Sequence, residues 1–285
     1  MRWTNYHGHC EYCDGKGRIE DYVIKAIELK MATIGISSHA PVPFETNWTM
    51  PEGNLPGYLQ EVAFLKDKYK GEIEVLRSLE VDYIPDTISP KASFIDESSL
   101  DYVVGSIHFV DQFEDGQHWA IDGSFAEFEK GLNEIFKGDI KAVVKRYFEL
   151  EREMIQHACP DIVGHMDKIK MHNKTKFLFD EKAQWYVDEV QKTLELIAEK
   201  GAVVEINTKA FKRNGLIFPG PEHFNTLKKL NIPITINSDC HHPDKLINGF
   251  EEVAEMLLEQ GIDQLHEFHE GKWVPVAFEK EGIVI

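Results

Sequence analysis

The segment IPITINSDCHH, residues 232–242, is the most informative part of the chain because a short predicted strand is followed there by two candidate metal ligands. Its first six residues are rich in β-branched side chains, which predicts a strand over 232–237. Asp239 and His241 follow this run, two positions apart. Successive side chains of an extended chain point to opposite faces, so these two point the same way and can enter one site.

Five further short runs, also predicted as strands, end in the same manner. They cover 3–7, 33–37, 73–81, 102–107 and 161–164, and the potential ligands at their ends are His7 and His9, His39, Glu80, His108 and His165. His7 and His9 are again two positions apart, and Gly8 between them lets the backbone pass close to an ion. Asp14, on the loop that follows, can reach the same cluster.

Amphipathic segments separate the strands, and one more strand is predicted over 202–207. Apolar residues recur at spacings of three and four in 20–30, 55–70, 140–157, 181–200, 220–230 and 247–260. About seven alternating β–α units predict an α/β fold with a parallel sheet, and the lack of a glycine-rich dinucleotide motif favours a closed barrel. The active-site face of a barrel lies where the strands end, which is where these ligands fall. The tail, 272–285, is predicted as a short hairpin or a strand outside the repeat.

The composition indicates a globular protein with a single domain over residues 1–285. The chain has 31 basic and 49 acidic side chains and a formal charge of −18. Such a surface repels nucleic-acid phosphates, so an anionic substrate needs bound cations beside it. No apolar run is long enough for a signal peptide or a membrane span, and four cysteines do not suggest a disulfide framework. We therefore expect a cytoplasmic protein that binds neither nucleic acid nor membranes.

Cys10 and Cys13 leave two interpretations open. They could form half of a zinc knuckle, or they could be loop and packing residues. A structural zinc site usually draws its ligands from two short pairs, and the sequence has no second CxxC, which favours packing. Cys240 alternates with Asp239 and His241 and should point away from the metals. The other histidines are predicted to be surface or packing residues, with the exception of His118.

Taken in order, these motifs resemble the polymerase-and-histidinol-phosphatase family, and within it the monofunctional histidinol-phosphatases. The motifs are HGH (7–9), CDG (13–15), SHAP (38–41), LEVDYIP (79–85), GSIHF (105–109), GHMDKIK (164–170), EINT (205–208) and SDCHHP (238–243). The resemblance implies a distorted (βα)7 TIM-like barrel and a site for two to three ions of zinc, manganese or iron. It also implies hydrolysis of L-histidinol phosphate, in histidine biosynthesis.

Carried over residue by residue, the resemblance implies three groups of ligands. The first is His7, His9, Glu80 and Asp239, the second is Glu80, His108 and His165 with Glu80 bridging, and the third is Asp14, His39 and His241. Glu80 and Asp239 would thus hold a metal-bridging hydroxide, the expected nucleophile. One departure is SSH before His39, where the family more often has Thr-Asp/Glu-His, so an acidic neighbour of His39 is lost.

The substrate contacts are predicted from the loops. Lys212 or Arg213, after the strand 202–207, could bind the phosphate, because a cation is needed there. His118 and Asp122, after the strand 102–107, could meet the imidazole and the amine of histidinol. Two other functions are weighed: a phosphoesterase of the same family that acts on another small phosphate monoester or nucleotide, and a non-enzymatic metal-binding protein. The second would require a missing metal ligand, and none is missing.

Overall fold

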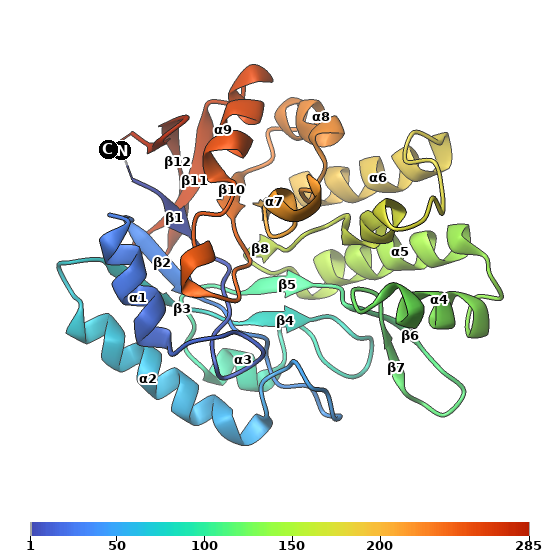
Figure 1. Ribbon diagram of the computed structural model, residues 1–285, viewed down its shortest axis with the longest axis horizontal. Helices are drawn as coiled ribbons and strands as arrows, with labels where there is room; N and C mark the ends of the chain where they lie inside the picture. Colours follow the sequence, from blue (N-terminus) through green and yellow to red (C-terminus); the bar gives the residue numbers. More distant parts are fainter. Residues whose placement is uncertain (1, 285) are drawn as a thin grey trace.

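Parallel strands surround the centre of the molecule in the computed structural model, which describes residues 2–284 (Figure 1). One sheet has the order β1 (Thr4–Asn5), β2 (Thr33–Ile36), β3 (Glu74–Arg77). The other has the order β10 (Ile234–Asn237), β9 (Val203–Asn207), β8 (Ile162–Val163), β5 (Val104–Ser106), β4 (Glu80–Asp82). Met1 of the opening segment and Ile285 of the predicted tail lie outside the described residues.

Single parallel bridges join the two sheets just beyond their strand ends. Gly8 pairs with Cys240, and His39 pairs with Glu80. The predicted strand 73–81 is divided into β3 and β4, because pairing with β2 stops at Arg77 and pairing with β5 begins at Glu80. When β3 and β4 are counted as one, residues 2–284 contain seven parallel barrel strands. The architecture is the predicted α/β fold, a distorted TIM-like barrel.

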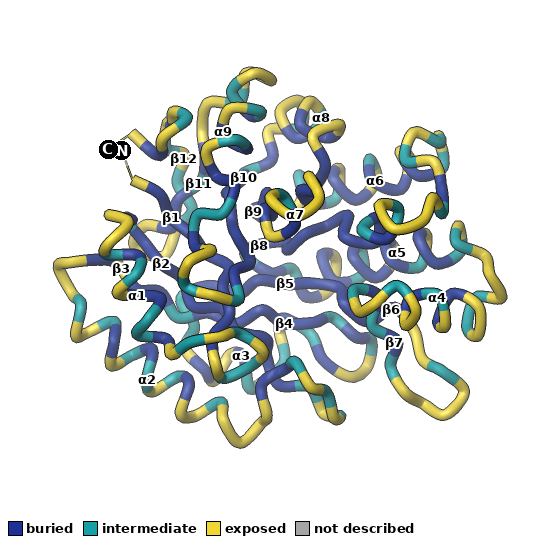
Figure 2. Tube along the Cα trace, in the orientation of Figure 1, coloured by how far each residue is buried: buried dark blue, intermediate teal, exposed yellow. Residues whose placement is uncertain are grey.

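Amphipathic helices cover the outside of the barrel. The predicted segments correspond to α1 (Ile19–Glu28), α2 (Leu55–Lys68), α5 (Ile140–Ala158), α6 (Gln184–Lys200), α8 (Phe224–Lys229) and α9 (Phe250–Glu259). In Figure 2 the barrel strands are mostly dark blue, and much of the helices is yellow or teal. In α5, Val144, Phe148 and Ile155 are buried at helical spacing, and the Asp139 side chain caps the first turn by accepting a hydrogen bond from the Ala142 amide. Among the described residues, no helix combines the length and the apolar character that crossing a bilayer requires.

Several short elements were not predicted. They are α3 (Ser93–Glu97), β6 (Phe109–Gln112), β7 (His118–Ala120), α4 (Phe125–Glu134), α7 (Phe211–Asn214) and β11 (Gln264–His269). β6 and β7 form an antiparallel hairpin that extends from the end of β5. The tail forms β12 (Lys272–Glu279) and β13 (Gly282–Ile283), which are antiparallel as predicted, and β11 adds a third strand beside β12.

The β11–β12 strands close the end of the barrel opposite the predicted ligands. A small apolar cluster contains inward residues of the barrel strands together with Phe268, and Trp273 packs against it. Glu267 of β11 is buried there and accepts hydrogen bonds from Thr4 Oγ1 at 2.9 Å and Tyr6 Oη at 2.8 Å. Burial raises the pKa of Glu267 to about 7.

This buried acid makes a pH-dependent contribution to stability. Because its folded pKa exceeds the unfolded value, the neutral acid stabilises the fold below about pH 4.5, and that contribution is lost as the pH rises through about 7. Glu267→Gln is neutral at every pH. Chemical denaturation should therefore show the variant gaining stability relative to wild type between pH 5 and pH 8, by about 3 kcal/mol. Glu279→Gln, exposed on β12, is the control, and its stability difference from wild type should not change with pH. If the difference for Glu267→Gln were also independent of pH, the raised pKa of Glu267 would be contradicted.

Candidate metal centre

All nine side chains predicted as metal ligands meet at the carboxyl ends of the barrel strands. They are His7, His9, Asp14, His39, Glu80, His108, His165, Asp239 and His241. Seven of them are less than a tenth exposed, whereas Asp14 and His241 lie at the rim with side chains 33% and 22% exposed. The strand-end pattern therefore identified groups that the fold brings together.

Glu80 lies at the centre of this cluster, and both of its carboxylate oxygens face imidazoles. Oε2 lies 3.2 Å from His7 Nε2 and 3.5 Å from His9 Nε2. It also lies 2.9 Å from His39 Nδ1. Oε1 lies 3.0 Å from His165 Nε2 and 3.7 Å from His108 Nε2. One carboxylate thus faces two groups of ligands, which is the arrangement that a bridging ligand needs.

Asp239 occupies the opposite side of the first group. Its Oδ1 lies 3.1 Å from His9 Nε2 and 3.9 Å from His7 Nε2. The neighbouring Cys240 is buried with its sulfur against Gly8, so it points away from the cluster as predicted. The side chains of His7 and His9, and those of Asp239 and His241, therefore point in the directions that their i, i+2 spacing predicted.

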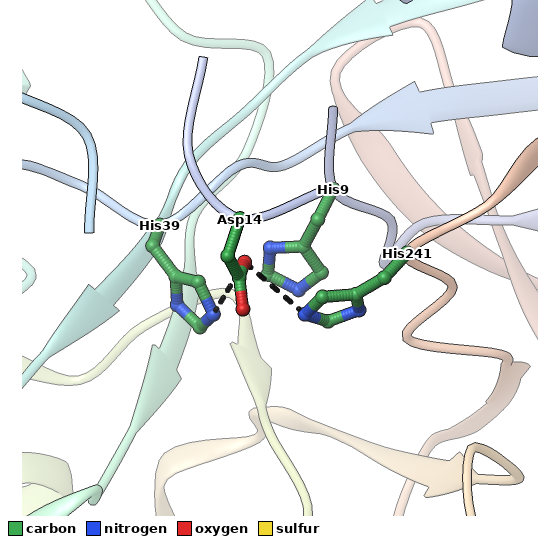
Figure 3. A group of neighbouring side chains, drawn as sticks. All are labelled: His9, Asp14, His39 and His241. Carbon is green, nitrogen blue, oxygen red and sulfur yellow. Dashed lines mark ion pairs between the residues drawn. The ribbon is translucent and has the colours of Figure 1, made fainter. Parts of the chain in front are cut away.

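The outer group, drawn in Figure 3, contains the two most exposed of the nine side chains, Asp14 and His241. It contains Asp14, His39 and His241, as the resemblance implied, and His9 faces it as well. Asp14 Oδ1 lies 3.3 Å from His241 Nε2 and 3.8 Å from His39 Nε2. One donor atom from each of the four residues lies within 4.8 Å of the others, so a single small cation could contact all four.

The chemistry of these donors fits divalent cations. His7 Nε2, His9 Nε2 and Glu80 Oε2 are buried and make no hydrogen bond to any described residue, although they point at one another. Burial would raise the pKa of Glu80, but His7, His39 and His108 hold it well below its usual range. Burial lowers the pKa of His165 to about 4. Ionised carboxylates and neutral imidazoles are the forms that bind metals.

Two buried carboxylates orient the imidazoles, and sequence reasoning gave neither of them a role. Glu205 on β9 lies 2.8 Å from His7 Nδ1 and accepts a hydrogen bond from the His165 amide at 2.8 Å. Asp82 on β4 lies 3.0 Å from His108 Nδ1. Each contact turns the other ring nitrogen toward the cluster, as outer carboxylates do in metal sites. The sequence did contain a signal for Asp82, since it is two positions from Glu80 on one strand and its side chain should point the same way.

Contacts of the two serines that precede His39 in the chain, and of one aromatic residue, support its position. Ser37 Oγ accepts a hydrogen bond from the Gly8 amide at 3.0 Å, and Ser38 Oγ accepts one from the Cys10 amide at 3.3 Å. Trp48 packs edge-to-face against the His39 ring, with centroids 4.6 Å apart. The position of His39 therefore depends on backbone anchoring and an aromatic contact.

The cysteines do not form a site of their own. The groups of potential ligands found in residues 2–284 contain no cysteine. Cys10 is buried with its sulfur 3.1 Å from Ser38 Oγ, and the Cys13 sulfur lies 3.6 Å from His9 Nδ1. Both therefore pack behind the cluster, which matches the packing interpretation and not the zinc knuckle.

A further group, Asp167, Glu222 and His223, already holds a cation from the chain itself. Lys170 Nζ lies 2.6 Å from Asp167 Oδ2 and 3.0 Å from Glu222 Oε1. The ammonium group occupies the position that a metal ion would need. This group is therefore an ion-pair network and not a second metal centre.

The cluster opens into a cavity of about 940 Å³, lined by the loop after β2, the β6–β7 hairpin and the loop after β9. The phosphate contact predicted for Lys212 or Arg213 stays a prediction: α7 turns this segment toward α9, where Lys212 pairs with Glu252, and Arg213 is exposed. Lys209, three residues earlier, lines the cavity instead. Its Nζ lies 3.0 Å from Asp239 Oδ1 and 3.3 Å from His241 Nε2.

His118 and Asp122 both line the cavity. His118 stacks on Phe44 with ring centroids 4.2 Å apart. Asp122 Oδ2 lies 3.9 Å from His108 Nε2 and 2.8 Å from the buried ammonium of Lys168, a partner that sequence reasoning missed. Burial would raise the pKa of Asp122, but Lys168 and His108 hold it well below its usual range.

Comparison with known proteins finds one family and several relatives. The family model described as PHP domain matches residues 5–209. The histidinol-phosphatase of Bacillus subtilis is 24% identical over 273 residues, which cover 90% of this chain and 99% of that protein. A Listeria monocytogenes protein of known structure has a TM-score of 0.76 at 22% identity, covering 87% of this chain and 99% of its own. The structure of Lactococcus lactis histidinol phosphate phosphatase, complexed with zinc, L-histidinol and phosphate, has a TM-score of 0.69 at 17% identity and covers 100% and 99%.

Replacement of the central carboxylate should remove metal. Glu80→Gln leaves neither the charge nor two equivalent oxygens for the five facing imidazoles, so elemental analysis should find at least one ion fewer per chain than in wild type. The double variant Cys10→Ser, Cys13→Ser is the control and should keep the wild-type content. Full metal content in Glu80→Gln would refute the bridging role, and a loss in the double variant would restore the zinc knuckle.

Proposed function

The chain belongs to the PHP domain family, and from that membership and its site we propose that it is a metal-dependent phosphomonoesterase that hydrolyses L-histidinol phosphate to L-histidinol and phosphate. The observation that carries the proposal is the group of ligands around Glu80, which opens into the cavity. Relatives named histidinol-phosphatase that align with nine-tenths of the chain support the choice of substrate.

Two to three divalent ions of zinc, manganese or iron would be held by the three groups. Imidazole and carboxylate donors suit these borderline metals. His7, His9 and Asp239 would hold the first ion, and His108 and His165 the second, with Glu80 between them; Asp14, His39 and His241 would hold the third. When bound, such ions supply a nucleophilic water near neutral pH and neutralise phosphate charge. Glu205 and Asp82 keep the His7 and His108 rings in position for that task.

Lys209 would bind the phosphate from the cavity side. Its side chain is 40% exposed, and its ammonium lies beside Asp239 of the first group and His241 of the third, where these groups meet the cavity. An ammonium is a compact charge that suits a phosphate oxygen. No serine or cysteine nucleophile is needed, because the donors around Glu80 already provide for an activated water.

Asp122 would bind the substrate amine. Its Oδ2 faces Lys168 and His108, which keep the carboxyl ionised, and the group lines the cavity. A cationic amine can therefore approach an acid that stays charged across the physiological pH range. His118, at the mouth of the cavity on the same hairpin, would contact the imidazole.

The charges around the cavity favour a cationic substrate over a nucleotide. The acidic residues among those that line the cavity are Asp14, Glu45, Asp122 and Glu127, and the lysines are Lys130 and Lys209. A nucleotide adds negative charge beyond the phosphate at the metals and brings no cation to Asp122. Histidinol phosphate instead carries an ammonium on its leaving group.

Asp122 should distinguish substrates with an amine from those without one. We expect wild-type protein to hydrolyse L-histidinol phosphate in the presence of zinc, manganese or iron. Asp122→Asn should lower kcat/KM for this ester by roughly tenfold to a hundredfold, the usual effect of losing a charge-assisted contact, and leave p-nitrophenyl phosphate nearly unaffected. Asp115→Asn, on the exposed turn of the same hairpin, is the matched control. Equal losses on both esters would assign Asp122 to the metal site.

Lys209 should matter for both substrates, because the phosphate is common to them. Lys209→Ala should lower kcat/KM for L-histidinol phosphate and p-nitrophenyl phosphate to a similar extent, roughly tenfold or more. Lys212→Ala removes the same charge from the same segment but on the outer surface, and should leave both rates unchanged. If Lys212→Ala gave the larger loss, the phosphate contact would belong to α7.

A further inference from the structure

We infer that Trp48 is the specificity-determining residue for the ring of the leaving group, an inference that rests on the proposed function. Trp48 belongs to an aromatic wall of the cavity, which we define as Phe44, Trp48, Phe109 and His118. Phe44 and Trp48 lie on the loop after β2, and Phe109 and His118 lie on the β6–β7 hairpin. Neither Phe44, Trp48 nor Phe109 was expected to have a role from the sequence.

The wall is continuous from the mouth of the cavity to the metal ligands. His118 stacks on Phe44 at 4.2 Å, and Phe44 meets Phe109 edge-to-face at 5.3 Å. Phe109 in turn stacks on Trp48 at 5.3 Å. Trp48 then packs edge-to-face against His39 and His108, with centroids 4.6 Å and 5.3 Å away. Trp48 is therefore the member of the wall that touches both the cavity and the ligands.

This position suits a planar group tethered to a phosphate at the cluster. In histidinol phosphate three carbon atoms separate the imidazole from the ester oxygen, and the middle carbon carries the amine. Trp48 and Asp122 both contact His108, the indole with ring centroids 5.3 Å apart and the carboxylate with Oδ2 3.9 Å from Nε2. Around His108, the phosphate would thus bind to the cluster, the amine to Asp122 and the ring to Trp48.

An apolar aromatic surface can also select for a ring, which the acidic side chains cannot do. The acidic rim attracts any cation, including amines without a ring, so charge alone gives little selectivity. Aromatic faces add stacking contacts that only a planar group can use. The geometry therefore points to phosphate esters of amino alcohols that carry a flat ring, and against their aliphatic counterparts.

Trp48→Leu and Trp48→Phe test this in the metal-loaded protein through kcat/KM and the inhibition constant of inorganic phosphate. Both quantities would change together if Trp48 only held the metal ligands in position. We expect Trp48→Leu to lower kcat/KM for L-histidinol phosphate roughly five- to thirtyfold, in line with the loss of aromatic contacts, and Trp48→Phe to restore most of it. The inhibition constant of inorganic phosphate, which reports the same metals without a ring, should stay within about twofold, and metal content should be unchanged. Phe64→Leu, an exposed aromatic on α2, is the control.

The outcomes separate this inference from the proposed function. A parallel loss of phosphate binding or of metal in Trp48→Leu would overturn the inference, because Trp48 would then act by holding His39 and His108. An unchanged kcat/KM for L-histidinol phosphate would also overturn it. Either result leaves the proposed function standing if the wild-type protein turns the ester over. No wild-type turnover would remove the proposed function and this inference with it.

Discussion

One buried carboxylate surrounded by imidazoles is the constraint on which the rest of the structure depends. Glu80 is 1% exposed and faces five histidines from four other segments of the chain. Removing a charge from water costs several kcal/mol unless partners compensate for it, and imidazoles do so only in their protonated form, which does not bind metal. Cations between these groups would offset that cost, so metal binding would also contribute to the stability of the barrel. The strand ends must meet at Glu80 for this to work, which explains why the ladders are short and irregular there.

The charges around the cluster lead to the same conclusion. Glu80, Asp82, Glu205 and Asp239 are all buried at this end of the barrel. Lys209 contacts Asp239, whereas Lys168 is engaged by Asp122, so most of these buried carboxylates have no ammonium group in contact with them. The backbone is also strained at two of the predicted ligands, because Asp239 and His165 have positive φ values of 45° and 20°, which non-glycine residues avoid. Such strain persists where other interactions over-determine the position, as at a ligand.

The sequence predicted the barrel and the clustering of nine side chains at one end of it for one physical reason. A parallel strand that ends in such a side chain specifies both the element and the edge of the sheet where the side chain lies. The i, i+2 rule then gave the direction of His7, His9, Asp239 and His241. The same rule could have found Asp82 beside Glu80. No comparable rule applies to loops, because the direction of a loop side chain depends on turns that periodicity does not predict. The sequence therefore indicated Lys212 or Arg213 and gave no role to Lys209, and the short helix α7, which turns Lys212 away, was not foreseen. The capping box of α4, Ser124 with Glu127, was a readable signal that went unused.

Strand ends and loops carry different functional information: the strand ends indicate the class of chemistry, and the loops determine the substrate. The ligand groups stand mostly on strand ends whose mutual distances the barrel sets, so the class of chemistry can be read from spacing alone. Lys209, Asp122 and Trp48 come from three loop or hairpin segments, and each reaches the cavity only because those segments fold over the same face. A change in one loop can therefore alter which leaving group fits without disturbing Glu80 or its histidines. Sequence motifs then identify the family reliably, whereas the substrate within the family depends on the loop contacts that only the folded chain defines.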